Sequence, residues 1–201
     1  MRKGDQTKAA VLDCAVALAS RVGLEGLSIG GLAKDAGLSK SGLFAHFDSK
    51  QNLQLEVLRK SVERFVARVV APALAESRGI PRLRALFENW LLWSKDPSLP
   101  GGCFFIAAAN ELDDRPGPLR DRLVAYQRDW IDALTTAARI ATEEGQFRED
   151  LDTKQFAYEF YSTLMMYHHF NRLMRDPEAE SRTRRSFDRL IETSTANRNA
   201  C

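Results

Sequence analysis

The sequence has few cysteines, and those present form no framework. Cys14, Cys103 and Cys201 lie far apart among 201 residues, and no pair has the spacing of a zinc site. The formal net charge of +2 is nearly balanced, so a nucleic-acid-binding surface would have to be a local patch. We therefore expect a reduced, cytoplasmic protein with no disulfide framework, no metal and no other cofactor.

Long apolar runs are also missing. The longest uncharged run, residues 97–110, contains prolines and is too short to cross a bilayer. Near the N-terminus, Asp13 and Arg21 interrupt a helically spaced apolar pattern, so no signal peptide is expected. We expect no membrane partner, while a hydrophobic content of 44% suffices for a packed core.

No stretch alternates apolar and polar residues as a half-buried strand does. Almost every segment instead repeats apolar residues three and four positions apart, as in Leu12, Ala15, Val16 and Ala19. The sequence predicts an all-α chain of about nine helices, with three N-terminal helices followed by a larger C-terminal helical bundle.

Polar residues mark where the first helices begin. Ser28 and Ser39 are the predicted N-caps of two short helices. Asp48 is the predicted cap of a long helix, because Gln51 follows three residues later in capping-box spacing.

Later in the chain, prolines and glycines mark interruptions. Pro72 is expected to kink or end the long helix, and Gly145 is the predicted stop of a helix over residues 119–144. Asp152 is another predicted cap, and the Asp-Pro pair at residues 176–177 is predicted to open the last helix.

The segment from Ala33 to Phe47 has the spacing of a helix-turn-helix. Ala33 lets two helices cross closely, Gly37 takes the turn, and Leu43 fixes the second helix on the first. The residues of the second helix that do not face the first are mostly small, polar or basic, which suits insertion into the major groove of DNA. They are Ser39, Lys40, Ser41, Phe44 and His46. Lys50 follows, near enough to meet a phosphate. An ordinary helical hairpin with solvated polar residues is the alternative at this point.

Residues 27–58 read LSIGGLAKDAGLSKSGLFAHFDSKQNLQLEVL and resemble the N-terminal domain of TetR/AcrR-type transcriptional regulators. The resemblance rests on the glycine turn, the short second helix, the aromatic-x-His-Phe run and the Ser-Lys that opens a long helix. It implies a helix-turn-helix DNA-binding domain over residues 1–50 and a ligand-binding and dimerisation domain over residues 51–201. It also implies a homodimeric repressor that binds a palindromic operator in double-stranded DNA and leaves it when a small-molecule effector binds.

The resemblance also implies which residues contact DNA: Ser28, Ser39, Lys40, Ser41, Phe44, His46 and Lys50. Phe44 stands where tyrosine is common, so it offers only an apolar contact, such as one to a thymine methyl group. Gly30 and Gly31 have no side chains with which to read bases. Arg2 and Lys3, in an N-terminal arm, are expected to add positive charge.

Aromatic residues are plentiful after residue 51, and most are expected to form the core. Polar side chains among them could hydrogen-bond a guest in an otherwise apolar cavity. By similarity to the family, the cavity takes an apolar or aromatic small molecule and lies among the helices that start near Asp48, Ile80, Cys103, Leu119 and Asp152. The predicted ligand-binding residues are Phe65, Trp90, Trp93, Phe105, Asn110, Tyr126, Trp130, Tyr161, Met165 and His168.

The helices over residues 152–174 and 177–191 resemble the family's dimerisation pair. The first is apolar on two sides, with Phe156 on one and Ala157 on the other, so it needs two partners. We expect the second partner to come from another subunit, in a four-helix interface with twofold symmetry. The arginines of the last helix are expected to form its solvated face.

The remaining polar clusters carry no recognisable chemistry. His168 and His169 point about 100° apart on a helix, so they cannot chelate one ion. The acidic cluster at residues 111–114 comes without a nucleophile or metal-ligand spacing, so no enzyme is expected. Cys103 is either a thiol sensor or a buried, inert cysteine. A helical small-molecule-binding protein or enzyme with a purely structural N-terminal hairpin is the alternative function.

Overall fold

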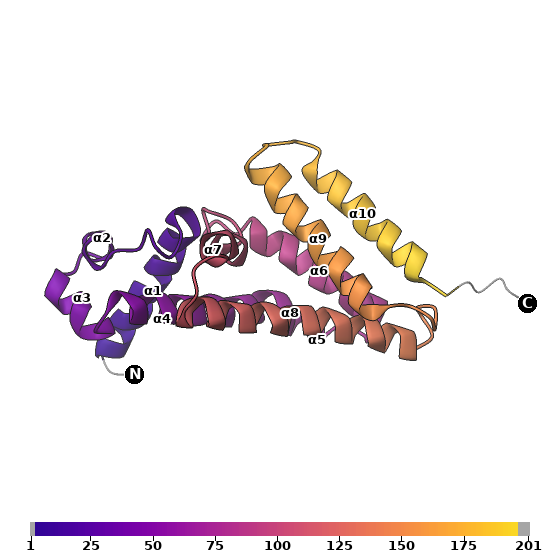
Figure 1. Cartoon of the computed structure of the whole chain (residues 1–201), viewed down its shortest axis with the longest axis horizontal. Coiled ribbons are helices and arrows are strands. Elements are labelled where there is room, and N and C mark those ends of the chain that lie inside the picture. The colour runs from indigo at the N-terminus through magenta and orange to yellow at the C-terminus, as the bar shows by residue number, and fades with distance from the viewer. Residues whose placement is uncertain (1–2, 197–201) are drawn as a thin grey trace, which may run out of the picture. The chain divides into compact units, whose positions relative to one another are not determined.

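The computed structural model describes residues 3–196, with side chains from Thr7 onward, and they fold almost entirely as helices (Figure 1). The first helices are α1 (Lys3–Val22), α2 (Ile29–Asp35), α3 (Lys40–Phe47) and α4 (Lys50–Phe65), and α4 continues through the π-helix η1 (Val66–Val70) into α5 (Ala71–Leu74). The later helices are α6 (Ile80–Ser94), α7 (Phe104–Leu112), α8 (Pro118–Glu143), α9 (Thr153–Arg172) and α10 (Ala179–Ser194).

The predicted all-α class is confirmed. With α4, η1 and α5 counted as one interrupted helix, the described residues form nine helices. Their only strand-like pairing is an isolated bridge between Phe147 and Thr195. No helix in the described range is long and apolar enough to span a membrane.

The start of α4 differs from the prediction. Ser49 is the N-cap, because its Oγ accepts a hydrogen bond from the Asn52 amide at 3.1 Å. Asp48 instead follows α3 with a φ of +60°, and the Ser49 amide donates to the Phe47 carbonyl oxygen across it at 2.6 Å. This is a tight γ-turn. The predicted Asp48 cap was wrong because both residues are good caps and only the turn decides between them.

Pro72 interrupts its helix without ending it. The hydrogen bonding widens to the π pattern over Val66–Val70, and α5 then runs past the proline to Leu74. A helical proline lacks an amide donor, and its ring clashes with the carbonyl group four residues earlier, which here belongs to Arg68. The π segment contains that carbonyl and accommodates the clash.

The caps predicted at Ser28, Ser39 and Asp152 are confirmed. Their side-chain oxygens accept hydrogen bonds from backbone amides two or three residues later, at 3.0 to 3.1 Å. The last helix begins at Ala179, slightly later than predicted, because Asp176 uses its carboxylate to close the turn before the helix.

The chain divides into two compact units. One comprises Met1–Val66 and Ser94–Tyr126, and the other comprises Ala67–Trp93 and Gln127–Cys201. The segment around α7 thus belongs to the same compact unit as the N-terminal helices. The predicted functional domains, residues 1–50 and 51–201, stay a prediction, because compactness does not test which residues bind DNA or a ligand.

The first unit has a small apolar core under the N-terminal helices. It buries Leu12, Val16, Leu27, Leu32, Leu43 and Phe47, whereas Leu38 is half-buried. The loop before α7 crosses α1 so closely that a Cβ on Gly101 would lie 1.5 Å from the Ser20 carbonyl oxygen. The Gly101 amide also donates to Ser20 Oγ at 3.0 Å. Only glycine fits this crossing.

The second unit is built around stacked aromatic rings. Phe87 of α6 lies parallel to Phe187 of α10 with ring centroids 4.0 Å apart, and Phe160 of α9 meets Phe187 edge-on at 5.2 Å. All three rings are buried, and each contributes roughly 1.5–3 kcal/mol to folding through burial. The rings therefore join α6 to the consecutive helices α9 and α10, which lie far from it in the sequence.

Candidate nucleic-acid interface

Helices α2 and α3 form a tightly crossed pair, which we call the reading head (residues 29–47). Gly37 makes the turn between them with a φ of +66°, and the Leu38 amide closes it by donating to the Ala33 carbonyl oxygen at 2.9 Å. Ala33 and Leu43 are buried at the crossing. The spacing that predicted a helix-turn-helix therefore has the geometry of one.

The outer side of α3 is open to solvent. Ser39, Lys40, Ser41 and Phe44 are exposed, and His46 is half-buried with its ring edge toward Phe47. Phe44 keeps 52% of its surface exposed in a helix whose other phenylalanine is buried. An exposed aromatic ring beside small polar side chains suits contact with base edges and methyl groups in the major groove.

Two predicted contact residues already have structural roles. Ser39 Oγ accepts from the Gly42 amide at 3.1 Å and lies 3.3 Å from Ser41 Oγ. Ser28 Oγ accepts from the Gly31 amide at 3.0 Å. Since a hydroxyl oxygen used as a cap keeps its proton to donate, Ser28 retains a donor for a phosphate oxygen. The Ser39–Ser41 pair retains one such donor, because one of its two hydroxyls donates to the other.

Lys50 is paired within the protein. Its Nζ donates to the backbone carbonyl oxygen of Glu25 at 2.8 Å and to the Glu25 carboxylate at 3.1 Å. The hydrogen bond from Lys50, followed by one from Gln54, lowers the pKa of Glu25 below its ordinary value. The pair holds the lysine at the edge of the reading head, where it is still partly exposed.

The loop between α1 and α2 is held by side chains from two other helices. Gln54 of α4 donates to the Leu24 carbonyl oxygen at 2.9 Å. The Glu111 carboxylate of α7 accepts from the Leu24 and Glu25 amides, both at 2.7 Å. Sequence reasoning missed these residues. Gln54 could have been noticed as a polar residue on an apolar helix face, but no pattern links Glu111 to a loop 86 residues away.

Two basic residues expected to add positive charge near the reading head, Arg2 and Lys3, lie at the N-terminus. Arg2 and the side chain of Lys3 fall outside the described residues. Lys3 itself begins α1, which corrects the expectation that it belongs to an N-terminal arm. Lys34, in the last turn of α2, is exposed and lies close to Lys40 in the sequence.

The predicted ligand-binding residues divide between the two units. In the first, Phe65 and Phe105 meet edge-on at 5.5 Å, Tyr126 is half-buried and Asn110 is exposed. In the second, the buried or half-buried members are Trp90, Trp93, Trp130, Tyr161 and His168, whereas Met165 is exposed. Tyr161 donates a hydrogen bond to Gln127 Oε1 at 2.8 Å. The ligand role of all ten stays a prediction.

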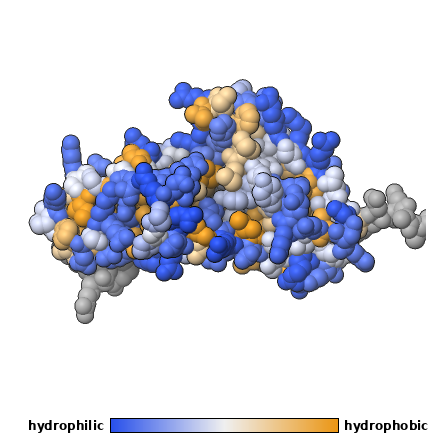
Figure 2. Space-filling model, in the orientation of Figure 1, coloured by the Kyte–Doolittle hydropathy of each residue, from blue (hydrophilic) through white to orange (hydrophobic). Residues whose placement is uncertain are grey.

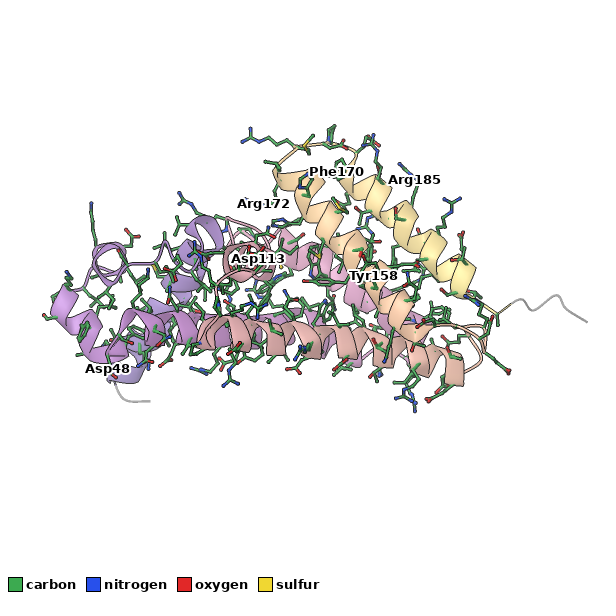
Figure 3. The ribbon with its side chains drawn as sticks, viewed as in Figure 1. Asp48, Asp113, Tyr158, Phe170, Arg172 and Arg185 are labelled. Atoms are coloured by element: carbon green, nitrogen blue, oxygen red, sulfur yellow. The ribbon has the colours of Figure 1, made fainter. Side chains whose placement is uncertain are left out.

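The α9–α10 pair carries a large apolar surface. Exposed apolar residues cluster toward the C-terminal end of α9: Met165, Met166, Phe170, Leu173 and Met174. Figure 2 shows apolar side chains interrupting the polar surface there, and Figure 3 labels Phe170 near the end of α9 and Arg185 on the neighbouring helix α10. A groove of about 310 Å³ lies between the two helices and includes Met166 and Phe170, but none of the predicted ligand residues.

The remaining sequence candidates are placed as follows. Cys103 is buried at the start of α7. For the other cysteine in the first unit, Cys14, burial is the main cause of a raised thiol pKa, and the charge of Asp35 adds to it. The described residues contain no cluster of three or more potential metal ligands among His, Cys, Asp and Glu. Arg184 of α10 pairs with Glu88 and Glu180, so the last helix is not a uniformly free basic face.

An all-α chain that presents a crossed helix pair of this kind is a helix-turn-helix protein. A family model for bacterial regulatory proteins of the tetR family matches residues 11–57, and a model for the C-terminal domain of tetracyclin repressor-like proteins matches residues 79–187. The chain belongs to the TetR family. It is therefore a DNA-binding transcriptional regulator and not an enzyme, which removes the enzyme alternative.

Individual relatives agree with this assignment. The HTH-type transcriptional repressor KstR2 of Mycobacterium tuberculosis is 26% identical over 152 residues, or 75% of this chain and 73% of KstR2. A TetR transcriptional regulator from Chloroflexus aurantiacus J-10-FL has a TM-score of 0.80 at 25% identity, with 96% of each chain covered. AibR, solved in complex with isovaleryl coenzyme A and operator DNA, shares the fold with a TM-score of 0.72 at 21% identity, covering 94% of this chain and 98% of AibR.

Proposed function

We propose that this protein is a ligand-responsive repressor that binds a palindromic operator as a homodimer and is released by a small apolar or aromatic inducer. The observation that carries the proposal is the outer side of α3, where Lys40, Ser41 and Phe44 are exposed after the N-cap Ser39. Repression is the activity named for KstR2. A repressor of this kind acts on the chromosome, in the cytoplasm.

DNA contacts are proposed at the predicted residues. Lys40 and Lys50 would neutralise phosphates, and the serine hydroxyls would donate to phosphate or base oxygens. His46 would lie against the backbone. Phe44 has no hydroxyl, so we assign it an apolar contact with a thymine methyl group in the major groove.

The homodimer is supported by the apolar end of α9. Leu173 is 71% exposed and Met174 59% exposed, and a monomer rarely leaves neighbouring apolar side chains so open. Pairing α9 and α10 with their copies would bury them in a twofold interface. A twofold dimer with two reading heads requires an operator with matching symmetry, which is why we propose a palindrome.

The inducer class is supported by the aromatic residues of the second unit. Trp90, Trp93 and Trp130 are buried there, and Tyr161 and His168 are half-buried. Small-molecule sites combine apolar walls with a few polar groups of this kind. AibR was solved with isovaleryl coenzyme A, so acyl thioesters belong in the first panel of compounds beside aromatic and polycyclic ones.

The operator proposal can be tested by selecting sequences from a random duplex library and by gel shift with DNA that flanks the protein's own gene. We expect one enriched sequence with twofold symmetry, bound by a dimer, and release of that DNA by a compound that also raises the melting temperature. Failure to enrich any sequence would contradict DNA binding. Enrichment of a site without symmetry would contradict the palindrome alone.

The dimer proposal has its own matched pair of variants. Leu173→Glu should give a monomer in light scattering after size-exclusion chromatography, because it buries a charge in the proposed interface. Leu92→Glu is the control, since Leu92 is also an exposed leucine of the same unit, at 67%, but lies on α6. A Leu173→Glu variant that remains dimeric would rule out this face.

A further inference from the structure

The two-residue centre of the α1–α2 loop has all of its backbone polar groups bound by side chains. The Leu24 and Glu25 amides donate to the Glu111 carboxylate at 2.7 Å each. The Leu24 carbonyl oxygen accepts from Gln54 at 2.9 Å, and the Glu25 carbonyl oxygen accepts from Lys50 at 2.8 Å. Each of these four groups is bound by a side chain from another helix, and together the bonds restrain the loop.

Glu111 is the member of this set that comes from furthest along the chain. It is half-buried near the end of α7, and hydrogen bonds from amides to a charged carboxylate are about twice as strong as neutral ones. Gly23, the residue before Leu24, makes room for the Glu111 side chain. The φ of Gly23 is +76°, and a Cβ on it would lie 2.7 Å from both Glu111 carboxylate oxygens. The loop backbone is thus shaped around this one side chain.

The loop leads directly into the reading head. Ser28, the N-cap of α2, follows Glu25 by three residues, so the direction in which α2 and α3 leave the core depends on how the loop is fixed. Lys50, a proposed phosphate contact, is bound to the same loop. Moving the loop would therefore displace both α3 and the neighbouring Lys50.

We propose that Glu111 is a positioning residue for DNA binding, through which α7 fixes the orientation of the reading head. This inference rests on the proposed operator binding. Without the carboxylate, the reading head samples several orientations. The apparent affinity for DNA then falls in proportion to the fraction of molecules whose head has the orientation that binds DNA. By reciprocity, DNA that orders the head must also stabilise the end of α7.

The test compares Glu111→Gln with Asp114→Asn in the full chain. Both remove one negative charge at the same end of α7, but the Asp114 side chain is exposed and, unlike that of Glu111, has no hydrogen bond or ion pair with the described residues of the loop. Charge removal alone would tighten DNA binding in both variants. We expect Glu111→Gln instead to bind the selected operator about tenfold more weakly, the size of one lost charge-assisted hydrogen bond, with Asp114→Asn at or above wild-type affinity.

Two further readouts separate positioning from general stability or direct contact. The slope of binding against salt concentration should stay at its wild-type value in Glu111→Gln, because no phosphate contact is removed. Hydrogen exchange should show faster exchange of the Leu24 and Glu25 amides in the free variant, and operator-induced protection of residues 104–112 should be present in wild type and lost in the variant. Glu111→Asp keeps the charge but shortens the reach, so it should bind as weakly as Glu111→Gln.

The outcomes are distinct. If wild type binds its operator and Glu111→Gln binds equally well with unchanged exchange at Leu24 and Glu25, the positioning role is wrong and the proposed function stands. If Glu111→Asp restores full affinity, charge and not geometry is responsible, which also overturns the inference. If wild type selects no DNA, the proposed function fails and this inference fails with it.

Discussion

The ammonium group of Lys50 lies 3.1 Å from the Glu25 carboxylate and 2.8 Å from the Glu25 backbone carbonyl oxygen. The lysine expected to meet a phosphate is therefore already ordered. Holding a flexible side chain in place before binding reduces the entropy lost when it contacts DNA. The Glu25 carboxylate also competes with the DNA phosphate for the Lys50 ammonium group. The net effect of Glu25 on DNA affinity is therefore the balance between ordering the lysine and competing for it.

The first prediction concerns the two lysines near the reading head. Lys40→Gln and Lys50→Gln should each weaken operator binding and lower the salt slope by about one unit, because each removes one phosphate contact. Binding should be measured by fluorescence anisotropy over a range of salt concentrations. Unchanged slopes in both variants would show that neither residue contacts a phosphate.

A second prediction follows from the lowered pKa of Glu25. A carboxyl group with a lowered pKa in the folded state adds stability above its unfolded pKa of about 4.3, and this stability is lost as the pH falls through the folded-state pKa. The side chains of Lys50 and Glu25 are 44% and 43% exposed, so the effect is screened and should reach only about 0.5 kcal/mol. Urea unfolding should show Glu25→Gln less stable than wild type at pH 7 but not at pH 3. An equal difference at both values would contradict the assignment.

The turn between α3 and α4 supports a third prediction. Asp48 has a φ of +60°, a region that costs a non-glycine residue about 1 kcal/mol. Figure 3 marks its position at the end of α3. Asp48→Gly should therefore raise the free energy of unfolding by up to about 1 kcal/mol, less the extra entropy of glycine in the unfolded chain. Asp48→Asn, which keeps the Cβ, should have little effect. A destabilised Asp48→Gly would mean that the carboxylate, and not the backbone, matters at this site.

A fourth prediction contrasts two glycine-to-alanine changes. In Gly101→Ala the new methyl group would meet the α1 backbone, so we expect a loss of about 3 kcal/mol. In Gly30→Ala nothing lies within 4 Å of the added carbon, and the residue is in α2, so we expect a gain of about 0.5 kcal/mol. Thermal melts of both variants against wild type provide the comparison. Similar melting temperatures for the two would show that the crossing at Ser20 tolerates displacement.

Much of the fold could be predicted because its signals are local. Helical spacing, the serine caps and the turn at Gly37 depend on residues within a few positions of one another. The same holds for the exposed residues of α3. The error at Asp48 also has a local origin, since two adjacent residues compete for one capping position and backbone geometry decides.

What could not be predicted depends on pairs distant in the sequence. Nothing near Glu111 indicates that its carboxylate binds the amides of Leu24 and Glu25. The ion pair of Lys50 with Glu25 is similarly hidden, because lysine and glutamate are ordinary surface residues in any helical protein. The only trace in the sequence of the close crossing of Gly101 over α1 is a glycine in a loop. A loop glycine by itself does not predict such a crossing.

The contact of Glu111 with the α1–α2 loop also limits how this protein can be recombined with its relatives. The N-terminal family model ends at residue 57, which makes that point an obvious junction for a chimeric regulator with a new effector specificity. A chimera joined there would leave the Leu24 and Glu25 amides without their acceptor, unless the new C-terminal segment supplied a carboxylate at the same place. Transplanting the recognition function of this protein therefore requires carrying over one residue from the half that is to be replaced.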